Sequence, residues 1–236
     1  MKLVIAPMFA LLVLFAGCTS KCIEDSGNRI KKSAVLKNFD EIDLSGAFKV
    51  VLRQDSSYAV KIEADSNVIN SVKVDVSGDE LRIQMDEGIY CGTDSIVIQI
   101  GIGELKTLKT AGSVSIRTDG HIYANDVVLN FSDSSNISLV MNAGKVTTHM
   151  DGTNTLSLQG QAGVHELYCK GTATVNAFDF TAGVYNLEVT GSAKANINVL
   201  NELNVKTEGA SEVYYKGNPQ KVKEKKSGAA KLEKVN

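Results

Sequence analysis

The chain has 236 residues, with 25 basic and 27 acidic side chains and a formal net charge of −2. This near balance gives no electrostatic preference for nucleic acid or another polyanion. Aromatic residues make up 6% of the chain and Trp is absent, which disfavours stacking platforms for bases or sugars. The length is sufficient for one large β domain or two small ones.

Residues 1–17 have the pattern of a secretory signal. Lys2 supplies a positive start, residues 3–15 are almost entirely apolar, and two small residues precede Cys18. A span needs about 20 apolar residues, so this run is too short to be a membrane helix. Residues 15–18 resemble a lipobox, which predicts that Cys18 is lipidated and anchors the chain to a membrane. An ordinary signal peptide followed by a chance cysteine is the alternative. Because no Asp follows Cys18 at once, we expect an outer-membrane lipoprotein, and its surface exposure is left open.

Three cysteines remain besides Cys18. In an oxidising envelope Cys22 and Cys91 could form a disulfide, which leaves Cys169 over. Cys169 falls at an inward strand position and is expected to be a buried free thiol. The cysteines and histidines show no zinc-site spacing, so no metal is predicted.

The sequence after the signal divides into three parts and a tip. Residues 18–37 are polar and mixed in charge, and are predicted to be a lipidated N-terminus and tether. Residues 38–104 are predicted to hold strands, because apolar and polar residues alternate, and a hairpin turning at Gly78. Residues 105–232 are predicted to be repeats, and residues 233–236 a C-terminal tip.

The repeat consists of a turn residue, three small or polar residues, and then an apolar, a polar and an apolar residue. Its anchors lie about 19 residues apart. They are Asp133, Gly152, Gly171, Gly191, Gly209 and Gly228, with a looser copy beginning at Thr110.

Repeats of this size bury their apolar residues only by stacking on one another. The predicted fold is therefore all-β, a parallel β-helix-like solenoid with rungs of about 19 residues and N-terminal strands as a cap. One inner column would contain Val114, Ile137, Leu156, Val175, Ala195 and Val213. The other would contain Ile116, Leu139, Leu158, Ala177, Ile197 and Tyr215. A β-sandwich is the alternative, since regularly spaced short strands are typical of sandwiches too. The Lys-rich residues 221–236 are expected to be a polar cap, rather than an arm for nucleic acid.

No catalytic constellation emerges from the sequence. The acidic residues do not recur in register, and His121, His149 and His165 are too far apart for a metalloprotease motif. His149 and His165 are expected to lie at the surface or rim. No catalytic residue and no cofactor is predicted. Ser, Thr and Asn crowd the turn side of the repeat, where they would stabilise corners or form a flat polar surface for a glycan or protein.

Several patches in order resemble the head GIN domain family of auto-transporter adhesins. They are residues 22–28, 39–46, 48–54, the rung glycines and residues 215–219. The resemblance implies a right-handed β-helical fold and an envelope or surface role, and it brings no catalytic residues. Asp133 and Thr110 depart from the pattern, since glycine is expected at both positions.

These observations lead to a hypothesis of a non-enzymatic envelope lipoprotein that acts as an adhesin or ligand-binding solenoid. A structural or assembly partner of an envelope complex is the second hypothesis. A carbohydrate-active enzyme is the third, and it would require two carboxylates within about 10 Å in a cleft.

Overall fold

A computed structural model describes residues 22–85 and 90–236. The predicted signal segment and the predicted lipidation residue Cys18 lie outside the described residues. No helix among the described residues is both long and apolar enough to cross a membrane.

The described chain is all-β, which confirms the predicted class. Twelve strands form one open sheet, and a 3₁₀ turn, η1 (Ile69–Ser71), is the one helical element in this part of the chain. The strands are β1 (Arg29–Val35), β2 (Glu41–Gln54), β3 (Ala59–Asp65), β4 (Lys73–Ser77), β5 (Glu80–Gln84), β6 (Ile96–Ile102), β7 (Thr107–Thr118), β8 (Ile122–Phe131), β9 (Ser134–Met150), β10 (Thr153–Lys216), β11 (Lys221–Ser227) and β12 (Ala230–Lys234).

The N-terminal part mixes two kinds of pairing. β3 pairs antiparallel with β1 and β6, and β4 with β5 in the predicted hairpin. β2 instead pairs in parallel with β5, β6 and β7, and so joins this part to the rest of the sheet. β1 falls inside residues 18–37, where a tether was predicted. That prediction fails for 29–35 because backbone pairing with β3 forms β1 even though its side chains are mostly exposed.

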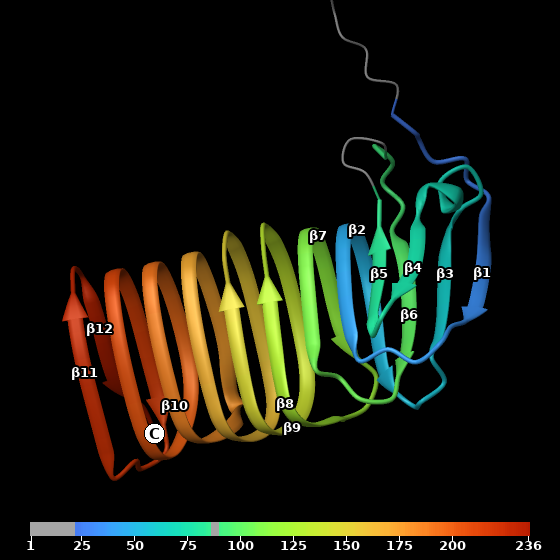
Figure 1. Ribbon diagram of the computed structural model, residues 1–236. Helices are drawn as coiled ribbons and strands as arrows, with labels where there is room; N and C mark the ends of the chain where they lie inside the picture. The colour runs from blue at the N-terminus through green and yellow to red at the C-terminus, as the bar shows by residue number, and fades with distance from the viewer. Residues whose placement is uncertain (1–21, 86–89) are drawn as a thin grey trace, which may run out of the picture.

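From β7 onward every pair is parallel, and Figure 1 shows the ribbon of β7–β12 winding in successive coils along one axis. In the β9–β10 pair, Leu156 lies beside Ile137 and Leu158 beside Leu139. Each partner is one repeat earlier in the chain. Residues at equal positions of the repeat therefore share one face, and the apolar ones stack inside.

The core follows both predicted columns from Ile137 onward, but the first coil differs. Val114 pairs with Ser135, and Ile116 with Ile137, two residues away from the predicted alignment. Gly112 therefore takes the glycine position, where Thr110 was predicted. The predicted copy placed its anchor, Thr110, 23 residues before Asp133, whereas Gly112 and Asp133 are 21 residues apart in the sequence.

The corner residues form a stack that we call the glycine column. At each glycine of this column except Gly46, an added Cβ atom would clash with the backbone of the preceding coil. At Gly46 it would clash with the ring of Phe48. The members are Gly46, Gly112, Asp133, Gly152, Gly171, Gly191, Gly209 and Gly228. Their positive φ angles suit glycine, and Asp133 adopts φ 62° with a carboxylate oxygen accepting from the Gly112 amide at 2.9 Å.

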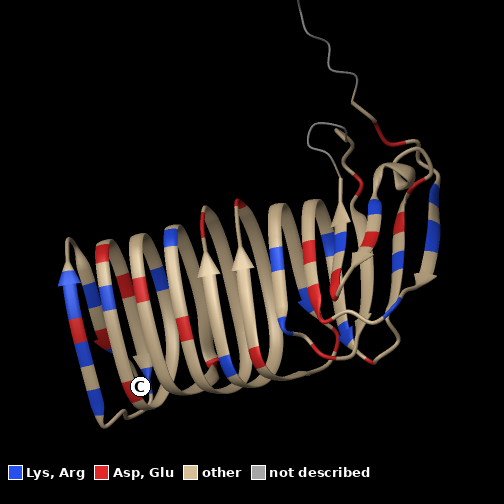
Figure 2. Cartoon of the chain, in the orientation of Figure 1, with Lys and Arg blue, Asp and Glu red and all other residues tan. Residues whose placement is uncertain are grey.

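The two ends of the sheet carry basic strands. Figure 2 shows Lys and Arg along β1 and β11, and all seven residues of β11 are exposed. Charged edge strands resist pairing with other chains. β11 and β12 occupy the stretch predicted to be a polar cap, and β12 extends to Lys234, inside the predicted tip.

Candidate functional site

A groove of about 490 Å³ lies where the N-terminal part meets the first coils. Its floor is the outward face of β2, β7, β9 and β10, and residues 90–95 form one wall. The lining residues are Ala47, Phe48, Lys49, Tyr90, Gly92, Thr93, Asp94, Ser95, Ile96, Ser113, Val114, Ser115, Ser134, Ser135, Asn136, Thr153 and Thr155.

The floor of the groove carries two rows of small polar side chains. They arise because side chains alternate between the two faces of a strand while parallel register stacks equal positions. The rows are Ser113, Ser134 and Thr153, and Ser115, Asn136 and Thr155. Within the described chain none of these six side chains hydrogen-bonds to protein, so their hydroxyl and amide groups face the groove.

Other polar residues of the repeat serve the corners, as one of the two sequence interpretations expected. Asn154 is 2% exposed. Its side-chain Oδ1 accepts from the Ser135 backbone amide at 3.1 Å, and its side-chain Nδ2 donates to the Asp151 backbone carbonyl at 2.7 Å. The inward-facing Ser135 and Thr110 hydroxyls lie 2.7 Å apart. The inward side chains of Asn154, Ser135 and Thr110 thus support the corner interpretation, and a polar surface for a glycan or protein stays a prediction.

The wall of the groove is tied to the N-terminal segment. A disulfide joins Cys22 to Cys91 with their Cα atoms 5.7 Å apart. Beside it, the Cys91 amide donates to the Ile23 carbonyl at 3.0 Å, and Ile23 forms a β-bridge with Tyr90. These links place Asp25 against residues 90–94.

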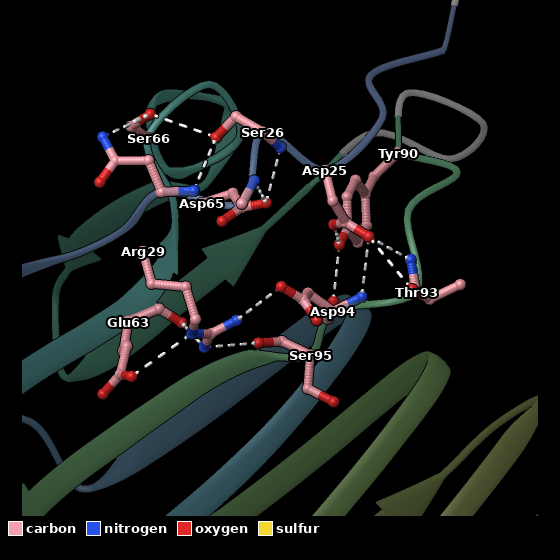
Figure 3. A network of polar contacts seen from close by, with 12 residues as sticks. Asp25, Ser26, Arg29, Glu63, Asp65, Ser66, Tyr90, Thr93, Asp94 and Ser95 are labelled. Carbon is pink, nitrogen blue, oxygen red and sulfur yellow. Dashed lines mark hydrogen bonds and ion pairs between the residues drawn. The ribbon is translucent and has the colours of Figure 1, made fainter.

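Asp25 organises the wall through four hydrogen bonds, drawn in Figure 3. One carboxylate oxygen accepts from the Thr93 amide at 2.6 Å, the Thr93 hydroxyl at 3.2 Å and the Asp94 amide at 3.1 Å. The other oxygen accepts from the Tyr90 hydroxyl. The Tyr90 hydrogen bond is the main cause that holds the pKa of Asp25 below its usual range. Burial, followed by the nearby Asp25 carboxylate, raises the pKa of Tyr90.

Two more carboxylates approach Asp25. One oxygen from each of Asp25, Asp65 and Asp94 lies within 4.8 Å of the others. Asp65 is 2% exposed; its Oδ2 accepts from the Ser26 amide at 2.9 Å, and its Oδ1 has no hydrogen-bond partner among the described residues. We call these three residues the carboxylate cluster.

Sequence reasoning missed the carboxylate cluster. Its members are far apart in the sequence and belong to three different segments, so no local motif contains them. The one available signal was the predicted Cys22–Cys91 pairing, which brings residues 22–25 close to residues 91–94.

The histidines differ from expectation at one position. His165 was expected at the surface or rim, yet it is fully buried, with Nε2 3.1 Å from the Thr148 hydroxyl. It pairs with Val146 and shares the inward side of β10 with Leu167. Burial lowers the pKa of His165 to about 3. Cys169, two positions beyond Leu167, is a buried free thiol as expected.

Comparison with curated proteins finds no match. Solved structures similar to this chain include a "putative adhesin" from Bacteroides fragilis, at 17% identity and TM-score 0.85, covering 90% of this chain and 100% of that one. Another is a "putative adhesin" from Parabacteroides distasonis, at 17% identity and TM-score 0.70, covering 91% and 100%. A "putative lipid binding protein" from the same species has 19% identity and TM-score 0.67, with 92% and 100% covered. These similarities establish the fold.

The family comparison covers most of the chain. A model described as "Putative auto-transporter adhesin, head GIN domain" matches residues 38–219, from just before β2 to just after β10. This span includes the groove floor, the glycine column up to Gly209, and two of the three carboxylates. The chain therefore belongs to the head GIN domain family of auto-transporter adhesins.

Proposed function

We propose that this protein is a non-enzymatic lipoprotein of the outer membrane that binds an extracellular glycan in the groove. In this proposal the coiled part is a right-handed parallel β-helix with one sequence repeat per rung. Acylation of Cys18 after removal of residues 1–17 holds the protein at the membrane. Membership of an adhesin family supports an envelope or surface role.

The observation that carries the glycan proposal is the pair of polar rows on the groove floor. Hydroxyl and amide groups without protein partners are suited to exchanging hydrogen bonds with the hydroxyl groups of a sugar. Neighbouring strands are about 4.8 Å apart, a spacing close to the length of one pyranose ring. Tyr90 in the wall adds an aromatic ring to the same groove. The rows could therefore contact consecutive sugar units.

A carbohydrate-active enzyme would need one carboxyl group held protonated as a general acid. The groove does not offer the required pair of carboxylates, because Asp94 is the one acidic side chain among its described lining residues. Among the described residues, every carboxyl group with a shifted pKa has it lowered, and these are Asp25, Asp55, Glu63, Glu80 and Glu202. The chemistry of the groove thus favours binding over hydrolysis.

Substitutions on the groove floor test the binding site. The full chain, purified in mild detergent, is screened on a glycan array, and the dissociation constant of the best glycan is measured by calorimetry. We expect the double variant Ser115→Ala, Asn136→Ala to weaken binding at least about fivefold, because each of the two lost hydrogen bonds contributes about 0.5–1.5 kcal/mol. Asn176→Ala is the matched control, since Asn176 is exposed on the coiled part outside the groove. Equal affinity for the double variant and the wild type would rule out the floor as the binding site.

The location is tested separately by protease shaving of intact cells that carry a tag after Asn236. We expect the tag to be lost while a periplasmic marker survives. A protected tag would place the protein on the periplasmic side. That result would contradict the surface role and favour a structural partner of an envelope complex.

A further inference from the structure

We propose that Asp25, Asp65 and Asp94 bind one Ca²⁺ ion beside the groove. This inference does not depend on glycan binding. It rests on the geometry of the carboxylate cluster and on the unpaired oxygen of Asp65.

The geometry matches a calcium ion. Ca²⁺ binds oxygen ligands at about 2.3–2.6 Å, so two ligands on opposite sides of the ion lie about 5 Å apart. The three carboxylate oxygens of the cluster lie within 4.8 Å of one another. Figure 3 shows Asp25, Asp65 and Asp94 gathered from the N-terminal segment, the end of β3 and the segment before β6. One ion could therefore contact all three segments.

The second observation is the state of Asp65, which is independent of the spacing. Its side chain is 2% exposed, and its buried Oδ1 has no hydrogen-bond partner in residues 22–85 and 90–236. A buried carboxylate oxygen that lacks a partner costs free energy, and a bound cation is one way to satisfy it. Asp25 also has capacity to spare, because its Oδ1 accepts one hydrogen bond, from Tyr90, within the described chain.

Arg29 forms an ion pair with Asp94 of the cluster, but most of its guanidinium hydrogen bonds go to Glu63 and Ser95. Its Nη2 donates to the carbonyls of Glu63 at 3.3 Å and Ser95 at 3.0 Å, and its Nε donates to the Glu63 carboxylate at 3.4 Å. The approach of Nη1 to Asp94 is longer, at 3.8 Å. Arg29 therefore neutralises part of the cluster from one side and does not hydrogen-bond to Asp65 Oδ1.

The ligand set selects among metals. Three carboxylates and no thiolate or imidazole suit a hard cation and disfavour zinc and copper. Mg²⁺ binds oxygens at about 2.0–2.1 Å in strict octahedral geometry and retains much of its water, so it fits this spacing less well. The inferred preference is Ca²⁺ over Mg²⁺, with a dissociation constant of about 10⁻⁴–10⁻³ M, as in extracellular calcium modules.

The direct test uses Tb³⁺ as a luminescent substitute for Ca²⁺. Tyr90 is hydrogen-bonded to Asp25, so its ring is placed to sensitise Tb³⁺ bound at the cluster. We expect the full chain in mild detergent to show tyrosine-sensitised Tb³⁺ emission. Ca²⁺ should displace Tb³⁺ at concentrations at least about tenfold lower than Mg²⁺. Calorimetry with Ca²⁺ alone provides a second measurement.

Three variants decide whether the signal comes from the cluster. Asp65→Asn removes a ligand charge while keeping an oxygen for the Ser26 amide. Asp94→Asn removes a ligand charge at a side chain that is 47% exposed. Each should weaken Ca²⁺ binding at least about tenfold. Tyr90→Phe tests whether the emission depends on this residue. Asp151→Asn, at an exposed corner on the coiled part, is the control and should bind like wild type.

Two results would overturn the site. The first is that no heat and no Tb³⁺ emission are detected up to 10 mM metal, which is about tenfold above the weakest expected dissociation constant. The second is that Asp65→Asn and Asp94→Asn both bind Ca²⁺ as tightly as the control. Because no glycan is present in these measurements, their failure is distinguishable from failure of the glycan proposal. Conversely, loss of glycan binding in the groove-floor variant would leave Ca²⁺ binding unchanged.

Discussion

Gly171→Ala is expected to lower the free energy of unfolding by about 2–4 kcal/mol. Gly171 has φ 79°, which costs an alanine strain energy, and an added Cβ would lie 2.5 Å from the Gly152 carbonyl oxygen of the coil before it. That oxygen accepts the Thr172 amide at 2.8 Å. Moving the coils apart to admit the methyl group would weaken this hydrogen bond and the contacts stacked behind it. Urea unfolding followed by far-UV circular dichroism, with the disulfide intact, measures the change.

Gly78→Ala separates backbone strain from the clash between coils. Gly78 lies in the turn between β4 and β5 with φ 59°, and an added Cβ meets no atom within 4 Å. Strain alone should cost about 1–2 kcal/mol. If both variants lose equal stability, close packing in the glycine column is not what requires glycine there.

His165 is expected to make the protein lose stability as the pH falls from 6.5. Burial lowers its pKa from 6.5 to about 3 in the folded chain, so between these values the unfolded chain binds a proton that the folded chain does not. The free energy of unfolding is therefore not reduced by His165 above pH 6.5, and it decreases as the pH falls from 6.5 toward 3. The loss is about 1.4 kcal/mol per pH unit, or roughly 2–3 kcal/mol by pH 4.5. Carboxylates whose pKa values are lowered in the folded chain also reduce the free energy of unfolding, mainly at lower pH.

This expectation is checked by measuring the free energy of unfolding at a series of pH values between 8 and 4.5. The series spans 6.5, the unshifted pKa of His165. His165→Gln removes the titrating group and retains a side chain able to hydrogen-bond to Thr148, so the slope below pH 6.5 should flatten even if absolute stability falls. His121→Gln changes an exposed histidine and should keep the wild-type slope. A wild-type slope in His165→Gln would show that acid sensitivity in this window comes from other groups.

The all-β class, the hairpin and most of the interior were predictable from local pattern. Alternation identifies inward residues such as Leu156 and Val175, and the regular spacing of glycines aligns one copy of the repeat with the next. The alignment failed at Val114 because the apolar pair Val114 and Ile116 was matched to Ile137 and Leu139, whereas Ile116 pairs with Ile137. The first coil has 21 residues between anchors rather than about 19, so the repeat spacing did not identify Gly112 as its anchor. The error at His165 was avoidable, since it has the same alternation as the inward Leu167 and Cys169.

The candidate site was less predictable, for a different reason. The groove wall depends on how the N-terminal segment packs against residues 90–94, through the Cys22–Cys91 disulfide and the hydrogen bonds of Asp25. Such contacts join distant parts of the chain through geometry that has no local signature. Asp65 is the clearest example, because its sequence neighbourhood gives no indication that the side chain is buried beside two other carboxylates.

The disulfide also sets how far the protein can stand from a membrane. If Cys18 carries lipid, only residues 19–21 lie between the anchor and Cys22, and a fully extended chain from Cys18 to Cys22 spans at most about 14 Å. The partner cysteine, Cys91, lies between the groove-lining residues Tyr90 and Gly92. The groove would thus stay within a few nanometres of the bilayer, so we expect it to encounter sugars carried close to the membrane far more often than those on long distal chains. Lengthening residues 19–21 would extend that reach without altering the groove itself.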